Sequence, residues 1–259
     1  MLDSSKGILA LVQARMSSKR LPGKVLMPCG QGTFLSQQLK RISSSKNVRK
    51  VVVLTSSDDS DEAIVDFCTS HDTQVFRGNL HDVFQRFYDF LEHESSNLSH
   101  FARLTADCPF ICSDLIDDVA EIALQSDFDY VSNTLEPTFP DGMDVEVIKI
   151  ESFLNLKGIN LNSYEREHVT PGIYFRPGIY SLANLTNSLN LSHYRWTLDT
   201  LSDATFLSKI SNEFPEIVTN PSYRKIKELI LDKGNYFPKT DTRKPISEGP
   251  WIEYSYSYD

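Results

Sequence analysis

Short apolar runs alternate with amphipathic segments through the first half of the chain. Residues 8–13 and 50–55 are almost wholly apolar, which is typical of central strands that are covered on both faces. Between them, residues 33–42 carry apolar side chains at helical spacing, and Thr33 is a suitable helix N-cap. This order of strand, helix and strand predicts a right-handed parallel unit of an α/β protein.

The same alternation continues to about residue 132 and then changes. We expect further helices at 60–70, 82–93, 113–125, 153–159, 199–212 and 223–231, and further strands at 73–76, 101–105, 129–132 and 194–197. The pattern predicts one α/β domain over residues 1–219 with a mostly parallel central sheet, and a C-terminal helix and polar tail over residues 220–259. The tail lacks periodicity, so we expect it either to be mobile or to wrap a neighbouring surface.

Composition narrows the class of protein. The net charge of -9 argues against nonspecific binding to nucleic acid or to an acidic membrane surface, because both need a basic face. The first 13 residues hold no basic leader, and their apolar run is too short to span a membrane. None of the four cysteines forms a CxxC pair. We therefore expect a cytoplasmic protein with neither nucleic acid nor membrane as a partner.

A cluster of cations follows the first predicted strand. Arg15, Lys19, Arg20 and Lys24 lie within one short polar segment, against the acidic trend of the chain. A loop at the carboxyl end of a buried strand is where open parallel sheets hold anions, so we interpret it as a site for a nucleotide triphosphate. A solvated basic turn is the alternative interpretation.

Several well-known motifs are absent from this loop and from the chain. Lys24 follows a glycine, but Val25 stands where a P-loop has Ser or Thr, and Ser18 stands where it has its first glycine. The GQG at residues 30–32 lacks the third glycine of a dinucleotide fingerprint. No GxSxG elbow and no HExxH motif occurs, so a serine hydrolase or a zinc protease has no support.

Two carboxylates follow predicted strands. Asp107 ends the strand in RLTADCP, and Asp199 follows the polar-aromatic strand in RWTLDTLSD. Each has an ordinary alternative role: Asp107 in a turn before Pro109, and Asp199 or Asp203 as a helix N-cap. Beside a cationic loop, however, two such carboxylates form a coherent set for a hard cation and nucleotide phosphates.

Other polar groups are weaker candidates. Arg77 and Asp82 are spaced for a structural ion pair, and Arg103 for a salt bridge on its strand. The loop at residues 141–144 and the segment at 165–168 are polar enough to line a sugar pocket. His168 alone is weak evidence for a functional site, because a single histidine in a sequence more often only makes structural hydrogen bonds.

Taken in order, these blocks resemble a known family. VQARMSSKRLPGKVL, LTSSDDSDEAI, FRGNLHDVFQRF, RLTADCPFI, FPDGMDVEV, EREHVTP and RWTLDTLSD are similar to the cytidylyltransferases of the spore-coat polysaccharide SpsF type. These are relatives of the CMP-sialic acid and CMP-KDO synthetases. The resemblance runs from about residue 8 to residue 210 and leaves the tail outside.

The resemblance implies a three-layer nucleotidyltransferase fold, GT-A-like or Rossmann-like, that forms a homodimer. Its acceptor and dimerisation subregion would cover about residues 134–195. It implies CTP as co-substrate and Mg²⁺ as cofactor. The first loop departs from the sugar-acid enzymes, since Met16, Ser17 and Ser18 replace a glycine-rich stretch.

The resemblance also assigns roles to residues of this chain. It implies catalytic roles for Arg15, Lys24, Asp107 and Asp199, with Mg²⁺ on Asp107 and Asp199. It implies CTP binding by Gln13, Ala14, Arg15, Arg20, Lys24, Thr55, Ser56, Asp61, Arg77 and Asp107. It places the acceptor near Arg103, and it implies that Asp141, Glu146, Glu165, Arg166 and His168 face either the acceptor sugar or the dimer contact.

The function expected is transfer of CMP from CTP to a sugar acid of the nonulosonic type, for surface polysaccharide or glycan. The acceptor hydroxyl would attack the α-phosphorus, and pyrophosphate would leave. One alternative is a glycosyltransferase. Such enzymes commonly bind their metal with a DxD motif, and Asp127-Phe128-Asp129 matches this motif. Another is a nucleotide-binding protein without catalysis.

Overall fold

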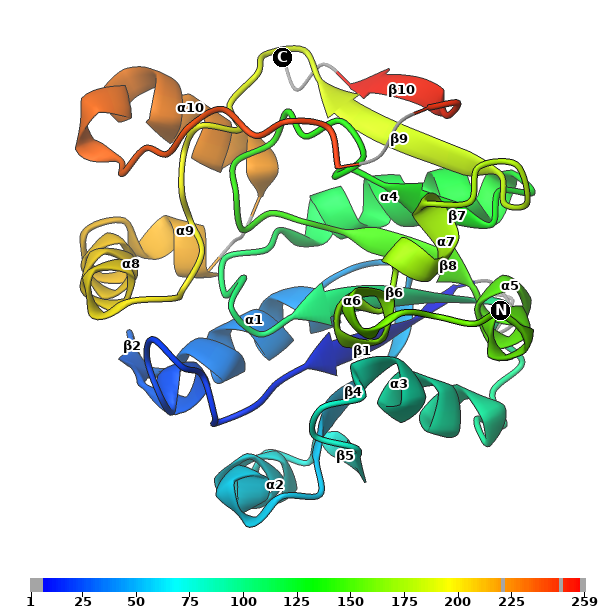
Figure 1. The fold of residues 1–259 in the computed structure, drawn as a ribbon. Coiled ribbons are helices and arrows are strands. Elements are labelled where there is room, and N and C mark those ends of the chain that lie inside the picture. The colour runs from blue at the N-terminus through cyan, green and yellow to red at the C-terminus, as the bar shows by residue number, and fades with distance from the viewer. Residues whose placement is uncertain (1–6, 220–221, 247–248, 257–259) are drawn as a thin grey trace, which may run out of the picture.

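An eight-stranded, mostly parallel sheet forms the centre of the molecule (Figure 1). The structure, a computed structural model, describes residues 7–219, 222–246 and 249–256. The strand order is β10-β9-β7-β8-β6-β1-β4-β5, and β8 alone runs antiparallel to its neighbours. The strands are β1 (Ile8–Gln13), β4 (Val48–Ser56), β5 (Gln74–Gly78), β6 (His100–Thr105), β7 (Tyr130–Ser132), β8 (Glu146–Lys149), β9 (Leu182–Asn187) and β10 (Ile252–Tyr256). A separate ribbon pairs β2 (Pro28–Cys29) with β3 (Gly32–Thr33).

The position of β1 at the centre of the sheet explains why its sequence is continuously apolar. Ile8, Ala10 and Val12 point into one hydrophobic cluster, and Leu9 and Leu11 point into the other. Both faces of the sheet are therefore covered, as expected for buried parallel strands. The fold class predicted from the sequence is confirmed.

Helices cover both faces of the sheet and make the outer layers (Figure 1). The first cluster buries apolar residues of α1 (Phe34–Ser43), α2 (Glu62–Ser70), α4 (Ser113–Gln125), α8 (Leu201–Glu213) and α10 (Tyr223–Lys233). The second buries those of α3 (Val83–Glu92), α5 (Ile150–Leu154) and α7 (Pro171–Tyr174), with α6 (Ser163–His168) against α3. Shorter elements are α9 (Pro215–Thr219), η1 (Lys24–Leu26), η2 (Asp59–Asp61), η3 (Asn155–Gly158) and η4 (Gly234–Tyr236). No helix within the described ranges is long and apolar enough to span a membrane.

Most predicted elements appear within a few residues of their expected bounds, and three details differ. Thr33 caps α1 as predicted, in a capping box with Ser36. The cap of α8 is Thr200, however, rather than Asp199 or Asp203, and Asp203 completes its capping box. The helix expected at 153–159 begins earlier, at Ile150, and continues as η3. The predicted pair of Arg77 with Asp82 is wrong, because Arg77 pairs with Glu62.

Residues 194–197 do not form the predicted strand. They make two isolated bridges, between Tyr194 and Lys239 and between Asp141 and Arg195. Their backbone groups bond to loops instead of a ladder: the Trp196 N–H donates to the carbonyl of Asp141, 2.7 Å away. The alternation of polar and aromatic residues reflects burial of Trp196 on one side and the charged site on the other.

Part of the tail belongs to the sheet. Strand β10 pairs in parallel with β9 and forms the edge of the sheet. Helix α10 buries Tyr223, Ile226 and Ile230 in the first cluster. The C-terminal segment is thus packed against the core along the ranges that the structure describes.

Candidate active site

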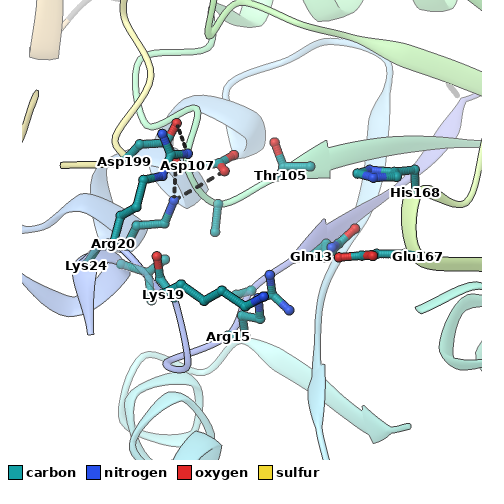
Figure 2. Close-up of a pocket in the computed structure, with 14 residues that line it drawn as sticks. Gln13, Arg15, Lys19, Arg20, Lys24, Thr105, Asp107, Glu167, His168 and Asp199 are labelled. Atoms are coloured by element: carbon teal, nitrogen blue, oxygen red, sulfur yellow. Dashed lines mark hydrogen bonds and ion pairs between the residues drawn. The ribbon is translucent and has the colours of Figure 1, made fainter. Parts of the chain in front are cut away.

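A cavity of about 400 Å³ opens at the carboxyl ends of β1 and β6. The chain leaves β1 toward β4 on one side, and β6 lies on the other side, so this is a topological switch point of the sheet. Open α/β sheets bind ligands at such points. Figure 2 shows Asp107, Asp199 and Lys24 at one end of the cavity and Glu167 and His168 at the other.

The basic loop after β1 forms one wall. The carbonyl of Met16 accepts bonds from the N–H groups of Ser18 and Gly23, each 2.9 Å away, which closes the loop on itself. Gly23 has φ of 73°, a left-handed conformation that suits glycine, and Lys24 then begins η1. The side chain of Lys24 thereby turns inward and is nearly buried, whereas Arg20 stays largely exposed.

Lys24 joins the two carboxylates of the site. Its ammonium lies 2.9 Å from Oδ1 of Asp199 and 3.3 Å from Oδ2 of Asp107. Asp107 directly follows the end of β6, and Asp199 precedes α8. The backbone joins them too, because the Leu198 N–H donates to the carbonyl of Asp107 at 2.8 Å. Two segments far apart in sequence are therefore fixed around one cation.

Arginine residues complete the charge balance at Asp199. Arg20 and Arg195 each place a guanidinium nitrogen 2.9 Å from its Oδ2. Burial favours the neutral acid, but Lys24, Arg195 and Arg20 outweigh it and hold the pKa of Asp199 below its usual range. Asp199 is thus a carboxylate ion at neutral pH.

A close approach of two loops sets the position of Arg195 and Asp199. Gly142 has φ of 103°, and a Cβ there would lie 2.7 Å from the backbone carbon of Trp196. Only glycine fits this contact. The side chain of Arg195 then reaches Asp141 at 3.1 Å and Asp203 at 3.3 Å.

A second cavity, of about 170 Å³, adjoins the first and shares Thr105 and His168 with it. Arg103 on β6 and Glu146 on β8 are register partners, and their side chains pair at 2.5 Å. Burial opposes the charge on Arg103, but Glu146 outweighs it and raises the pKa of the guanidinium. The remaining lining residues are Thr134, Asp144, Tyr164, Thr170, Tyr174, Arg243 and Ile246.

A strained turn places His168 between the two cavities. Val169 is fully buried and has φ of 72° and ψ of -64°, and the Thr170 N–H donates to the carbonyl of His168 at 2.9 Å. These values describe a γ-turn, which is rare and strained for a β-branched residue. Burial, with Arg103 nearby, lowers the pKa of His168, so its imidazole is neutral at pH 7.

The structure places ten of the seventeen residues predicted for the site on the walls of the two cavities. The first cavity is lined by Gln13, Ala14, Arg15, Arg20, Lys24, Asp107, His168 and Asp199. The second is lined by Arg103, Glu146 and His168. Neither cavity is lined by Thr55, Ser56, Asp61, Arg77, Asp141, Glu165 or Arg166.

Asp61 supports the basic loop from behind. It is fully buried and accepts from the Met16 N–H at 2.6 Å and from the backbone and hydroxyl of Ser56. Arg77 bonds to the carbonyls of Ser56 and Asp58 and pairs with Glu62. Both residues therefore order the backbone that flanks the loop.

The predicted acceptor residues outside the cavities hold the neighbouring segments. Asp141 pairs with Arg195, and Arg166 pairs with Asp82. Glu165 completes the capping box of α6 and pairs with Arg176. Burial and the nearby Asp144 raise the pKa of Asp141. These contacts fix α6 and the loop before β8.

Sequence reasoning missed several residues of the site. Arg195 stands four residues before Asp199, a spacing that could have suggested their pairing. Thr105 adjoins residues that were singled out, and Glu167 lies in the polar segment 165–168 but was assigned no role of its own. Arg243 lies in the tail and carries no sequence signal, because only the fold brings it to the second cavity.

The carboxylates suit a hard cation. Asp107 and Asp199 supply oxygen ligands at one end of the cavity, and Mg²⁺ usually takes one or two carboxylates plus phosphate oxygens and water. Among the described residues no group of three or more His, Cys, Asp or Glu could hold a metal ion by itself. This donor set fits a metal that arrives with a nucleotide.

The DxD motif at residues 127–129 lies outside both cavities. The side chain of Asp127 is 95% exposed and pairs with Lys149, and Asp129 accepts from Ser181. The glycosyltransferase alternative therefore gains no support from this pair.

Sequence comparison extends these observations to related proteins. The chain is 34% identical to an uncharacterized protein of Methanocaldococcus jannaschii over 88% of this chain and 91% of that protein. It is 32% identical to the spore coat polysaccharide biosynthesis protein SpsF of Bacillus subtilis, over 76% of this chain and 82% of that protein.

Solved structures show the same fold. A cytidylyltransferase from Leptospira borgpetersenii superposes with a TM-score of 0.80 and 30% identity, over 92% of this chain and 98% of that one. A CMP:2-keto-3-deoxy-manno-octonic acid synthetase complexed with CTP superposes with a TM-score of 0.59 at 11% identity, over 80% and 99% of the two chains. The sequence model of the family described as cytidylyltransferase matches residues 9–238. The chain belongs to the cytidylyltransferase family.

Proposed function

We propose that this chain transfers CMP from CTP to a sugar acid, with Mg²⁺, to give a CMP-sugar and pyrophosphate for surface polysaccharide or glycan. The observation that carries the proposal is the placement of Lys24 between Asp107 and Asp199, at a cavity walled by the basic loop. This arrangement offers cations to phosphates and carboxylates to a metal on the same wall.

The nucleotide triphosphate lies along the basic loop in this proposal. Arg15, Lys19 and Arg20 are exposed cations that line the cavity, and guanidinium groups suit phosphate oxygens. Lys24 is held by carboxylates until a nucleotide and metal arrive, and it then turns to the phosphates. Asp107 and Asp199 hold the metal, which when bound supplies charge stabilisation at the reacting phosphate.

The acceptor occupies the second cavity, and its hydroxyl enters the first beside Thr105 and His168. The hydroxyl oxygen attacks the α-phosphorus, the bond from that phosphorus to pyrophosphate breaks, and the hydroxyl proton passes to the neutral imidazole of His168. Lys24, Arg15 and Arg20 stabilise the negative charge that grows on the phosphoryl oxygens. The shared wall of the two cavities supports this direct transfer.

A homodimer contact through the acceptor half is part of the proposal. Tyr164, Phe175 and Ile179 are large apolar residues that are 51%, 48% and 68% exposed, and the rings of Tyr164 and Phe175 stack. Such an exposed apolar surface is suited to a second copy of the chain. Equilibrium sedimentation of Ile179→Asp beside the unaltered chain tests it: the variant is expected to be monomeric.

The direct test of the function is pyrophosphate release. Each of the four nucleoside triphosphates is incubated with Mg²⁺ and a panel of sugar acids and sugar phosphates. The proposal expects release from CTP alone and only with an acceptor. Tight CTP binding without release from any acceptor of the panel would favour a nucleotide-binding protein without catalysis.

A further inference from the structure

The wall of the second cavity includes a segment that lies beyond the residues matched by the family model. This segment, residues 239–246, is termed here the C-terminal strap, and the family match ends at residue 238. Two of its residues, Arg243 and Ile246, line the cavity. The second cavity is therefore completed by residues that lie outside the family match.

The strap is held in place at several points. Before it, the ring of Phe237 stacks on the buried Trp196, with centroids 5.2 Å apart. Within it, the Thr240 N–H donates to the carbonyl of His193 at 2.8 Å, and the Ile246 N–H donates to that of Leu135 at 3.1 Å. After it, β10 joins the edge of the sheet. A segment anchored in this way presents its side chains at fixed positions.

Arg243 and Asp144 form a dyad at the cavity wall. Nη1 and Nη2 of Arg243 lie 2.7 Å and 3.0 Å from the two carboxylate oxygens of Asp144. Burial opposes the charge, but Asp144 outweighs it and raises the pKa of Arg243 above its usual range. Arg243 therefore stays charged, and both side chains are partly exposed, at 20% and 30%.

The chemistry of this dyad suits a neutral polar group. A guanidinium has five N–H donors and a carboxylate has about four lone-pair sites, so a bidentate pair leaves donors and acceptors of both kinds. Its charges cancel, and Asp141 also lies 3.7 Å from Nη1 of Arg243, so the dyad offers no net positive charge to an anion. The second pair of the cavity, Arg103 with Glu146, is tied more firmly, since Gln13 and Tyr130 also bond to it.

We propose that Arg243, with Asp144, binds hydroxyl groups of a polyhydroxylated acceptor, and that the C-terminal strap thereby helps to select the acceptor. Hydroxyls donate to Asp144 and accept from Arg243, at the end of the acceptor remote from the basic loop. This inference rests on the proposed function and names two acceptor-binding residues for it.

The test separates acceptor binding from nucleotide binding. Arg243→Met, Asp144→Asn and the double variant are compared with the unaltered chain for CTP affinity and for acceptor KM, with 2-keto-3-deoxy-manno-octonic acid and N-acetylneuraminic acid among the probes. Each single variant is expected to raise acceptor KM by about 10- to 100-fold. CTP affinity is expected to be unchanged, and the double variant to be little worse than either single one, because the two residues act as a unit.

Two further variants make the result specific. Lys244→Met removes the neighbouring exposed cation of the strap and is expected to leave acceptor KM unchanged. Arg243→Lys keeps the charge without the planar fork, and it is expected to raise acceptor KM while preserving the fold.

Several results would overturn the inference. Acceptor KM unchanged in Arg243→Met and Arg243→Lys would do so, as would an equal loss of CTP affinity, which indicates a purely structural role. CTP binding by the unaltered chain without binding of any polyhydroxylated probe would also overturn it, while the nucleotide half of the proposed function stands. Absence of CTP binding would instead refute the proposed function itself.

Discussion

The ammonium of Lys24 lies 2.9 Å from Oδ1 of Asp199, a residue 175 positions further along the chain. The same ammonium contacts Asp107 at 3.3 Å. A buried cation between two carboxylates is stable without a ligand, and it can exchange one carboxylate for a phosphate when a nucleotide and metal enter. This relationship makes the cluster the centre of the proposed chemistry.

Removing either carboxylate is expected to abolish most turnover. Asp107→Asn or Asp199→Asn takes away a metal ligand and leaves the side-chain shape nearly unchanged, so we expect turnover at least about 100-fold lower. Pyrophosphate release at saturating CTP measures it. Asp127→Asn is the matched control, because that exposed carboxylate lies outside both cavities. Turnover of Asp107→Asn equal to that of the control would refute the metal assignment.

Arg195 is expected to stabilise the fold in a pH-dependent way. Burial opposes ionisation of Asp203, but Arg195 and backbone N–H groups outweigh it and lower its pKa. A carboxyl with a lowered folded-state pKa stabilises the protein above its unfolded pKa of about 3.9, and this stabilisation disappears as pH falls through the folded pKa.

We therefore expect the Arg195→Met substitution to lower the free energy of unfolding by about 2 kcal/mol at pH 7. The difference in the free energy of unfolding between the variant and the unaltered chain should become smaller below about pH 4. Urea unfolding at a series of pH values measures both. A difference that stays constant down to pH 3 would mean that Asp203 contributes nothing through its ionisation.

His168 is expected to set the acid limb of the pH profile. Its pKa is lowered by burial and by Arg103, while Glu167 and Glu146 act in the opposite direction. The imidazole accepts a proton only when neutral, so kcat should fall in acid, as pH drops through this lowered pKa, and should be flat near neutrality. The Tyr164 ring, centred 4.3 Å from the His168 ring, holds the imidazole in place.

His168→Asn tests this assignment. We expect kcat about 100-fold lower, with the acid limb lost and CTP affinity retained. The profile is measured at saturating CTP and acceptor. Glu167→Gln is the companion variant, since the carboxyl group of Glu167 lines the same cavity. An acid limb that survives in His168→Asn and vanishes in Glu167→Gln would transfer the role to Glu167.

The turn at Val169 predicts an inverted order of stability. Alanine and glycine both lose the buried methyl groups, but glycine alone accepts φ of 72° without strain. Val169→Gly should therefore be more stable than Val169→Ala by about 1 kcal/mol, the reverse of the usual order. Urea unfolding of the two variants measures this. A more stable alanine variant would show that the turn relaxes when the side chain is cut back.

Much of the fold was predictable from local patterns. The apolar run of β1 and the helical spacing of α1 depend on residues close in sequence, and each matches its element. The conformation of residues 194–197 was not predictable in this way. Their polar and aromatic residues alternate because the segment is a loop packed against Gly142, and not because it pairs with other strands in a sheet. Strand β10 was also missed, although its apolar and polar residues alternate as in a strand, because the run is exposed and its pairing with β9 depends on residues far away in the sequence.

The site was predictable where chemistry follows a strand. Asp107 and the cations of the basic loop adjoin strands that the sequence marks clearly, and their side chains line the first cavity. Asp61 and Arg77 looked similar in sequence, but burial of Asp61 beneath Met16 makes it a support for the loop. The contribution of Arg243 depends on the path of the strap, which no local pattern encodes.

One competition measurement tests the central claim most directly. The chain is mixed with equal amounts of ATP, CTP, GTP and UTP, Mg²⁺ and a sugar-acid acceptor, and the product is weighed by mass spectrometry. The account predicts an acceptor heavier by one cytidylyl group, which is cytidine monophosphate less water, formed together with pyrophosphate. An acceptor carrying a different nucleotide, or CTP and acceptor both left unchanged, would contradict it.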